Sequence, residues 1–340
     1  MKKLSNISHG WYFLTNSTNS DLNKKEIVKY LIFAALGVLI IYFIQKNIKF
    51  DDFIANLKKA NIAYVILSTS VGVLAVFLRA LRWQLMLKPM GYETSLANAY
   101  HATMSGYLVN LGIPRSGEVS RCAMLSKSDK VPLNVLVGTV LSERILDVLM
   151  LVVVICLAVF MQFDLLYGYV YNNLLIKILS NPTALILVAA VILSLMILAY
   201  KARSIFGKTG KLGKLFLGFF DGIKSIFTLK QPWLFILYTI GIWVCYWMMT
   251  YFILLAFDFS ANLGVSGGLS TLVFSSLGVI IPAPAGSATL YFIELGLSQI
   301  YSMEVSNATS IAIVMFSSNI AMIILAGTIS YIIMAKRTKA

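Results

Sequence analysis

Charged residues are scarce in this sequence. Aspartate, glutamate, lysine and arginine together make up 12% of the 340 residues, whereas hydrophobic residues make up 59%. Soluble globular domains carry roughly 25% charged residues. A water-soluble fold of this length would need a polar shell that these residues cannot supply. The composition therefore excludes a soluble globular protein and predicts an integral protein that crosses the membrane several times.

Residues for metal and redox chemistry are also few. His9 and His101 are the only histidines in the sequence, and the three cysteines, Cys122, Cys156 and Cys245, lie far apart. These spacings match neither a metal site nor a disulfide framework. The sequence also lacks a nucleophile elbow, a phosphate-binding glycine-rich loop and a nucleotide-binding module. We therefore expect no enzymatic activity, no cofactor and no bound metal.

Long apolar runs take the place of these missing features. Two of the runs contain helix breakers: the third ends at Pro114, and the seventh is interrupted by Pro282, Pro284 and Gly286. Such breaks are tolerated within a bilayer only where protein or a water-filled cavity covers the backbone. We therefore predict two re-entrant hairpins and about six spanning helices. The eight runs cover residues 30–45, 62–81, 96–113, 133–161, 183–200, 232–257, 264–297 and 308–334.

Loop charges favour this topology, because cytoplasmic loops carry an excess of lysine and arginine. With two re-entrant hairpins, the lysine-rich segment 201–231 faces the cytoplasm together with 1–29, 79–131 and 335–340. The hairpins then enter from opposite sides, as in inverted-repeat transporters. The predicted fold is all-α and polytopic, possibly an inverted repeat, although similarity between the halves is too weak to show one. Its parts are a polar cytoplasmic segment 1–29 without an evident signal peptide, one transmembrane domain 30–335 and a basic cytoplasmic tail 336–340.

Most ionisable residues near the apolar runs gather in two short stretches, 114–121 and 142–147, with two arginines at the end of the second run. In the first stretch Arg115, Glu118 and Arg121 are spaced by three, which on a helix places them along one face. Arginine suits phosphate oxygens because its planar fork can bind two of them and keeps its proton. The set could hold a lipid headgroup, or its ion pairs could simply fasten the first hairpin to the neighbouring helix. The five arginines and three carboxylates of this set are Arg79, Arg82, Arg115, Glu118, Arg121, Glu143, Arg144 and Asp147.

The second hairpin offers a different candidate. Pro282, Pro284 and Gly286 are expected to expose backbone groups near the middle of the membrane. Glu294 follows, and neither the seventh nor the eighth run contains a basic residue. Its carboxyl group could be protonated, paired with a distant arginine, or in contact with a substrate or coupling ion. The aromatic residues between 233 and 251 are expected to pack or to lie at the membrane surface.

Four motifs occur in order: Arg79-Ala80-Leu81-Arg82-Trp83, Ile113–Arg121 with the pattern Pro-x-Arg-x-Gly-Glu, Glu143–Asp147, and Ile281–Gly286. Over about residues 25–335 the sequence resembles the flippase-like transmembrane region of lysylphosphatidylglycerol synthases. The resemblance implies movement of a lipid across the bilayer. The charged positions of the family are matched here by Arg115, Glu118, Arg121, Arg144 and Asp147.

Two departures from that family limit what the resemblance implies. The family usually has Pro-Gly-Gly-x-Gly followed closely by Glu, whereas this chain has Pro284-Ala285-Gly286-Ser287-Ala288, with Tyr291 at the place of that Glu. Glu294 lies one turn later. The sequence also lacks the soluble aminoacyl-transfer domain of full-length synthases, so synthase activity is not implied.

We thus predict a protein of a bacterial or archaeal inner membrane, with both termini in the cytoplasm, that translocates or binds an anionic lipid. A phospholipid or a polyprenyl-phosphate-linked lipid would fit. The net charge of +14 is assigned to cytoplasmic loops and lipid headgroups and not to nucleic acid. The alternative is a non-catalytic accessory subunit that assists a glycosyltransferase or a lipid-modifying enzyme.

Overall fold

The computed structural model describes residues 55–171 and 231–337, except 57, 114, 282, 284 and 285. This part of the chain is helical and contains no strand, which confirms the all-α prediction. Several predicted segments lie outside the described residues: the runs 30–45 and 183–200, the segments 1–29 and 201–230, most of the loop 162–182, and residues 338–340.

Four of the described helices are long and apolar enough to cross a membrane: α4 (Ile62–Leu87, extended by the short helix η2, Lys88–Met90), α7 (Leu133–Met161), α12 (Pro232–Leu255) and α16 (Val305–Arg337). Large apolar side chains of α7, such as Val148, Val152 and Phe160, point outward and are exposed. Such a surface is unfavourable in water and ordinary in hydrocarbon. The protein is therefore a multi-pass membrane protein.

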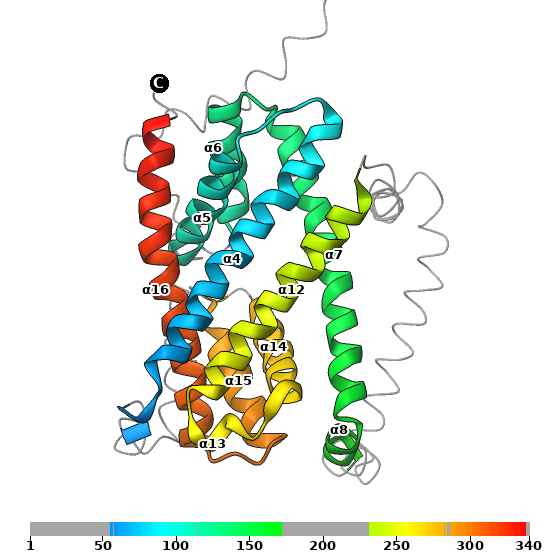
Figure 1. Ribbon diagram of the computed structural model, residues 1–340, viewed down its shortest axis with the longest axis vertical. Coiled ribbons are helices and arrows are strands. Elements are labelled where there is room, and N and C mark those ends of the chain that lie inside the picture. Colours follow the sequence, from blue (N-terminus) through cyan, green and yellow to red (C-terminus); the bar gives the residue numbers. More distant parts are fainter. Residues whose placement is uncertain are drawn as a thin grey trace, which may run out of the picture.

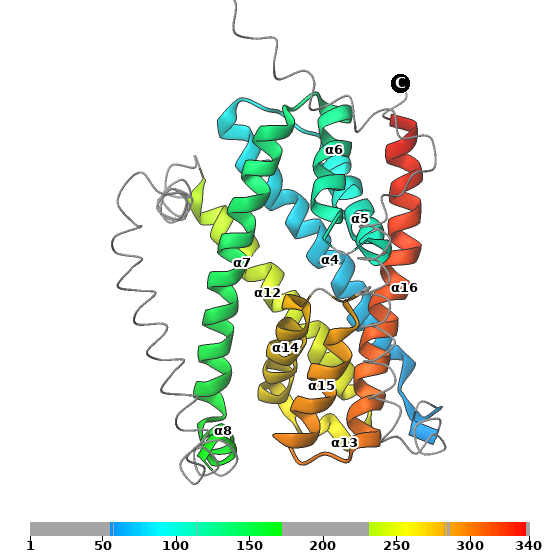
Figure 2. The same cartoon turned by 180° about the vertical axis from the view of Figure 1, so that it is seen from behind.

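Two antiparallel helix pairs fill the space between the long helices. The first pair is α5 (Leu96–Gly112) and α6 (Gly117–Asp129), and the second is α14 (Gly264–Ile280) and α15 (Ala288–Gln299). They enter from opposite ends of the molecule, and their tips meet near its middle (Figures 1 and 2). The seventh run is thus divided at its Pro/Gly segment, as the helix breakers predicted.

Glycine lets the two helices of each pair approach closely. A Cβ atom added at Gly117 would lie 2.2 Å from the carbonyl oxygen of Gly106, and one added at Gly278 would lie 2.4 Å from the Cα of Thr289. In both pairs the two residues in contact are 11 positions apart in the sequence (106 and 117, 278 and 289). Among the turn residues that the structure describes, each hairpin has one in the left-handed region, Arg115 with a φ of 64° and Gly286 with a φ of 77°. The two hairpins are built alike.

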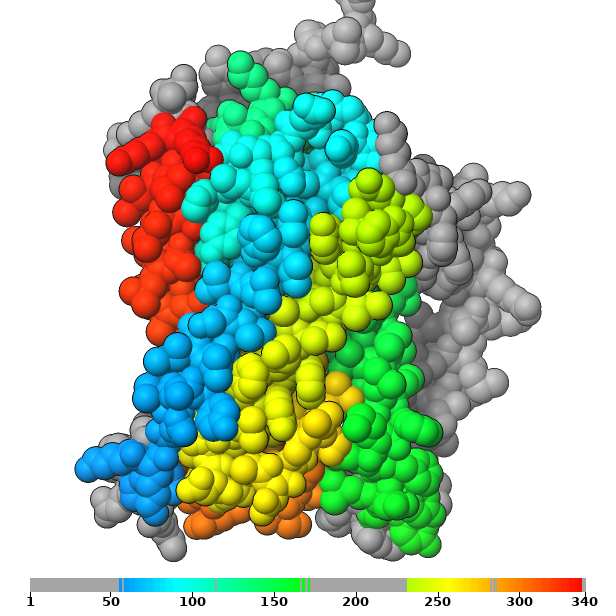
Figure 3. All heavy atoms as spheres, viewed as in Figure 1, coloured from blue at the N-terminus to red at the C-terminus, as the bar shows by residue number. Residues whose placement is uncertain are grey.

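The same order of elements occurs twice, with opposite direction. A long helix, a hairpin and a second long helix begin at Ile62, Leu96 and Leu133, and again at Pro232, Gly264 and Val305. Each later start follows its counterpart by 168 to 172 residues (96 to 264 and 133 to 305). α4 and α12, the first helices of the two units, pack side by side across one face (Figures 1 and 3). The described residues therefore have the arrangement of an inverted repeat.

Two apolar cores lie at the two ends of the molecule. One joins the end of α4 to the first hairpin and the start of α7, around Trp83, Leu125 and Leu136. The other joins the end of α12 to the second hairpin and the start of α16, around Phe257, Ile293 and Ile311. The short helices α8 (Phe163–Val170) and α13 (Asp258–Ala261) lie at the end that carries the second core (Figure 1). Each hairpin thus packs against the long helices of its own unit and also against one of the other unit, α5 against α16 and α14 against α7.

Candidate functional site

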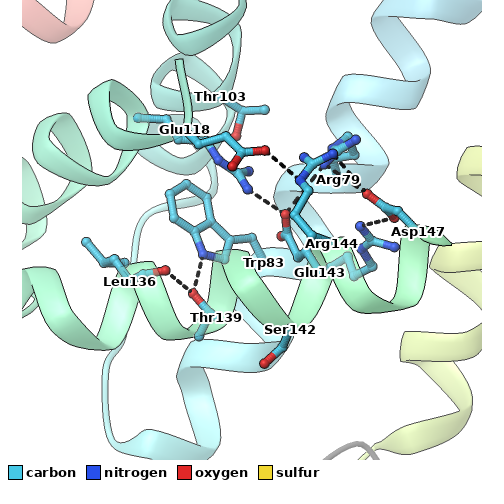
Figure 4. A network of polar contacts seen from close by, with 12 residues as sticks. Arg79, Trp83, Thr103, Glu118, Leu136, Thr139, Ser142, Glu143, Arg144 and Asp147 are labelled. Atoms are coloured by element: carbon cyan, nitrogen blue, oxygen red, sulfur yellow. Dashed lines mark hydrogen bonds and ion pairs between the residues drawn. The ribbon is translucent and has the colours of Figure 1, made fainter. Parts of the chain in front are cut away.

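The charged residues predicted from the sequence gather where α4, α6, α7 and α12 face one another. α4 supplies Arg79 and Arg82 from one face, because residues three apart lie along one side of a helix. α6 supplies Glu118 and Arg121 from its first turns, just after the hairpin tip. α7 supplies the adjacent pair Glu143 and Arg144, and Asp147 one turn later. Figure 4 shows the three carboxyl groups directed at the arginine side chains. We call these seven residues the ion-pair network.

Asp147 connects α7 to both arginines of α4. Its Oδ1 lies 3.0 Å from Arg82 Nη2, and its Oδ2 lies 3.4 Å from Arg79 Nη2. Both arginines also reach α12, since Arg79 Nη1 donates to the Tyr246 hydroxyl at 3.1 Å and Arg82 Nη1 donates to Thr239 Oγ1 at 3.4 Å. Three long helices are therefore joined by hydrogen bonds around one carboxylate.

Glu143 joins the first hairpin to α7 and is fully buried. Its Oε2 accepts a hydrogen bond from Arg121 Nη2 at 2.6 Å and lies 3.5 Å from Arg79 Nη2. The Arg121 guanidinium stacks on the Trp83 ring, 4.6 Å from its centroid. Trp83 is held in turn by its Nε1, which donates to Thr139 Oγ1 at 2.9 Å (Figure 4). The aromatic face and the carboxylate together fix Arg121 between α4 and α7.

Arg144 differs from the other arginines because its side chain is 40% exposed. Its Nε lies 2.7 Å from Oε1 of Glu118, which is 46% exposed, and its Nη1 lies 3.4 Å from Asp147 Oδ2. The side chains of Arg79, Arg82 and Arg121 are at most 5% exposed. A molecule outside the protein can therefore contact Arg144 and Glu118, but it cannot reach the buried residues of the network.

The interior of the network is not fully satisfied. Five network atoms are buried without a hydrogen-bond partner among the described residues: Arg79 Nε, Arg82 Nε, Arg121 Nη1, Arg144 Nε and Glu143 Oε1. The network as a whole has four arginines and three carboxylates, so it carries one positive charge in excess, although each arginine lies within 3.5 Å of a carboxylate oxygen. Buried donors and charge of this kind are costly, and they give this region a preference for an anion.

The structure separates Arg115 from the network. Arg115 lies in the exposed tip of the first hairpin, and its Nη2 donates to the carbonyl oxygen of Ile280 at 3.0 Å. Ile280 is the last residue of α14, where backbone carbonyls lack helical partners and attract a positive charge. Arg115 therefore links the two hairpin tips. The sequence placed it with Glu118 and Arg121 on one helix face, which is wrong because α6 begins only at Gly117.

In the second hairpin, Pro282 and Pro284 lie outside the described residues, and Gly286 occupies the turn with its φ of 77°. Glu294 lies on α15 and is partly buried. Within the described part of the chain no hydrogen bond or ion pair joins it to another side chain, and the structure brings it to none of the network residues.

Sequence reasoning missed four neutral residues that complete the site. Thr139, Thr239 and Tyr246 accept hydrogen bonds from network residues or from Trp83, and Trp83 supports Arg121. Tyr246 was assigned to packing because it lies in an aromatic segment. A signal existed for Trp83 alone, which directly follows Arg82 in the sequence. The other three reach the site from positions 56 to 167 residues away.

Comparison with known proteins gives a family for this arrangement. Residues 27–327 match the family described as "Lysylphosphatidylglycerol synthase TM region". The chain is also similar to the UPF0104 membrane protein MJ1595 of Methanocaldococcus jannaschii, with 31% identity over 127 residues. That match covers 36% of this chain and 38% of the relative. No solved structure matches the chain significantly.

Proposed function

Because the chain belongs to the lysylphosphatidylglycerol synthase TM region family, we propose that it translocates or binds an anionic membrane lipid. A phospholipid or a polyprenyl-phosphate-linked lipid fits the proposal. The observation that carries it is the position of the ion-pair network, which holds one excess arginine beside the tips of two opposed hairpins. Arginine recognises phosphate, and broken helices at mid-membrane are the usual substrate path of inverted-repeat transporters.

The lengths of the hairpin helices support re-entrant segments. α5 and α14 have 17 residues each, α6 has 13 and α15 has 12. At about 1.5 Å per residue even the longer ones extend only roughly 25 Å, short of the about 30 Å of a hydrocarbon core. A hairpin of this size turns inside the bilayer. Its tip then offers backbone groups to a headgroup that crosses between the two leaflets.

Exposed basic residues support a cytoplasmic position for the end that carries the first core. Lys88, Lys127, Lys130, Lys336 and Arg337 lie there, at the ends of α4, α6 and α16. The opposite end carries the acidic residues Asp164, Asp258 and Glu304, with Lys58 and Lys59. By the positive-inside rule, these residues support a cytoplasmic position for the first end and for the end of α16. Lipid would then reach the network from the cytoplasmic leaflet.

Reconstitution tests this proposal. Purified protein in liposomes that contain fluorescent phosphatidylglycerol is treated with a membrane-impermeant quencher. A translocating protein exposes nearly all of the label, whereas protein-free liposomes expose about the outer half. We expect transport by the wild type, loss of transport in Arg144→Gln, and wild-type transport in Asp164→Asn, a charge change at an exposed position of α8. The accessory-subunit alternative predicts no transport by the wild type and recovery of the protein in complex with an enzyme.

A further inference from the structure

The Arg144–Glu118 ion pair forms the outer edge of the ion-pair network and differs from the rest of it in how its two members are held. Glu118 makes one polar side-chain contact among the described residues, the 2.7 Å contact with Arg144 Nε. Arg144 is held a second time, by Asp147 at 3.4 Å. Because Asp147 itself is fixed by two buried arginines, Arg144 would stay in place if Glu118 turned away.

Glu118 occupies the position at Arg144 that an anionic ligand would need. The carboxylate lies 2.7 Å from Arg144 Nε as an ion pair and does not satisfy that nitrogen with a hydrogen bond. A phosphate oxygen in its place could make the charge-assisted hydrogen bond that Arg144 Nε lacks. Glu118 is 46% exposed, so its carboxylate has room to leave Arg144 by a change of rotamer, without movement of α6 or α7. The ligand would thus replace an internal carboxylate at a site that is already formed.

The charge of the network suits such a replacement. Its four arginines exceed its three carboxylates by one. A ligand with one negative charge that displaces Glu118 leaves this excess unchanged, and the nearby unpaired donor Arg121 Nη1 adds to the attraction. A phosphate ester with a single charge, such as the phosphodiester of a lipid headgroup, meets this condition.

We propose that Arg144 binds the phosphate group of the lipid and that Glu118 is a built-in competitor, which occupies Arg144 while no lipid is bound. The inference rests on the proposed lipid function and adds to it the contact residue and the step that admits the headgroup. A purely structural ion pair predicts the opposite effect of removing Glu118, because loss of a partner would loosen α6 from α7 and weaken the site.

Binding of short-chain phosphatidylglycerol to the purified full-length protein in detergent tests the exchange, with isothermal titration calorimetry as the measurement. The apparent affinity of a site is lowered by the fraction of molecules in which it is blocked. If Glu118 blocks Arg144 in about nine-tenths of the molecules, Glu118→Gln binds about tenfold more tightly than wild type. Arg144→Gln binds at least about tenfold more weakly. Asp164→Asn, which also removes one negative charge but at an exposed position of α8, binds like the wild type.

Two further measurements keep the proposal open to refutation. Glu118→Asp keeps the charge but shortens the side chain, so it also binds more tightly if Glu118 competes, and it serves if Glu118→Gln does not fold. Unchanged or weaker binding by both variants overturns the proposal. Inorganic phosphate is added as a competitor: displacement of the lipid supports recognition of a phosphate group from any source, and tight binding of phosphatidylglycerol without displacement supports recognition of the lipid.

The liposome assay separates this inference from the proposed function. If the wild type scrambles phosphatidylglycerol while Glu118 and Arg144 variants bind it like the wild type, the exchange at Arg144 is wrong and the proposed function stands. If binding follows the two residues as expected but no lipid crosses the membrane, the site stands and translocation is wrong.

Discussion

Glu143 is the residue on which the buried part of the network depends. Its fully buried carboxylate partners Arg121 and lies near Arg79. Removing one member of a buried ion pair leaves an uncompensated charge and costs about 3–5 kcal/mol. We therefore predict that Glu143→Leu lowers the free energy of unfolding by about that amount, measured by thermal unfolding in detergent. Glu304→Gln, an exposed position before α16, is the matched control and should leave stability unchanged.

A double variant separates the pair from its neighbours. Arg121→Met with Glu143→Leu removes both charges and should restore most of the stability, because apolar residues of similar volume can replace a buried ion pair without loss. If the double variant is as unstable as Glu143→Leu alone, Glu143 is held by more than this pair. A double variant of Arg144 and Asp147 is not expected to restore stability in this way. Asp147 also pairs with Arg79 and Arg82, and these two arginines would lose that partner.

The residues of the network could be predicted from the sequence, whereas their partners could not. Seven of the eight predicted residues meet in space because charged side chains at the ends of apolar helices can lower their energy by pairing. Arg115 was assigned to the wrong face because the exact start of α6 decides which way it points. The hydroxyl partners Thr239 and Tyr246 could not be found, since their contacts join helices about 160 residues apart and depend on tertiary packing.

At the level of elements, each hairpin depends on the close contact of its two helices. A Cβ atom at Gly117 would lie 2.2 Å from the Gly106 carbonyl oxygen, so Gly117→Ala must push α6 away from α5. Overpacking of this kind costs about 1–3 kcal/mol. We predict a corresponding loss of thermal stability for Gly117→Ala and, in the second hairpin, for Gly278→Ala, whose Cβ would lie 2.4 Å from Thr289 Cα.

Gly112→Ala is the matched control for this prediction. Gly112 ends α5, and no atom lies within 4 Å of the position that its Cβ would take. Alanine there should be neutral or slightly stabilising, because it restricts the unfolded chain. Equal losses of stability at Gly112 and Gly117 would show that glycine matters in this hairpin for another reason than close packing.

The positions of the helices could be predicted from the sequence better than the inverted repeat that relates the two halves. The predicted run 133–161 coincides with α7, and the Pro/Gly interruption of the seventh run separates α14 from α15. α4 continues to Leu87, past the predicted end of its run at 81, because Arg79 and Arg82 find partners and need not leave the apolar environment. The repeat was not detectable by residue type, since the first unit adds buried ion pairs to the apolar core around its hairpin, whereas the described hairpin of the second unit packs in an apolar core.

In the whole molecule, the two units have the same arrangement of helices but differ in the polar side chains that they carry. The unit from α4 to α7 carries the charges, and the unit from α12 to α16 contributes the opposed hairpin and the carbonyl group that Arg115 contacts. The two units touch at the hairpin tips, along α4 and α12, and where α5 packs against α16 and α14 against α7. A lipid that moves from one leaflet to the other would therefore leave Arg144, at the exposed edge of the ion-pair network, and meet backbone groups of the second hairpin.

This arrangement requires that the two hairpins enter the membrane from opposite sides. Cysteine-accessibility labelling in cells tests it, in a variant whose native Cys122, Cys156 and Cys245 are replaced. Lys127→Cys, exposed near the end of α6, should react with a membrane-impermeant thiol reagent only after the cytoplasmic side is opened. Glu304→Cys, exposed just before α16, should react in intact cells.

Val119→Cys completes the test, because it distinguishes a re-entrant hairpin from two spanning helices. Val119 is 63% exposed and lies in the first turn of α6, close to the tip of the first hairpin. If α5 and α6 crossed the whole bilayer, this tip would reach the outer surface and react in intact cells. A tip that ends in the middle of the membrane is shielded from outside, so we predict no labelling at this position in intact cells. Rapid labelling there would contradict the re-entrant hairpin and would place the ion-pair network near the outer surface.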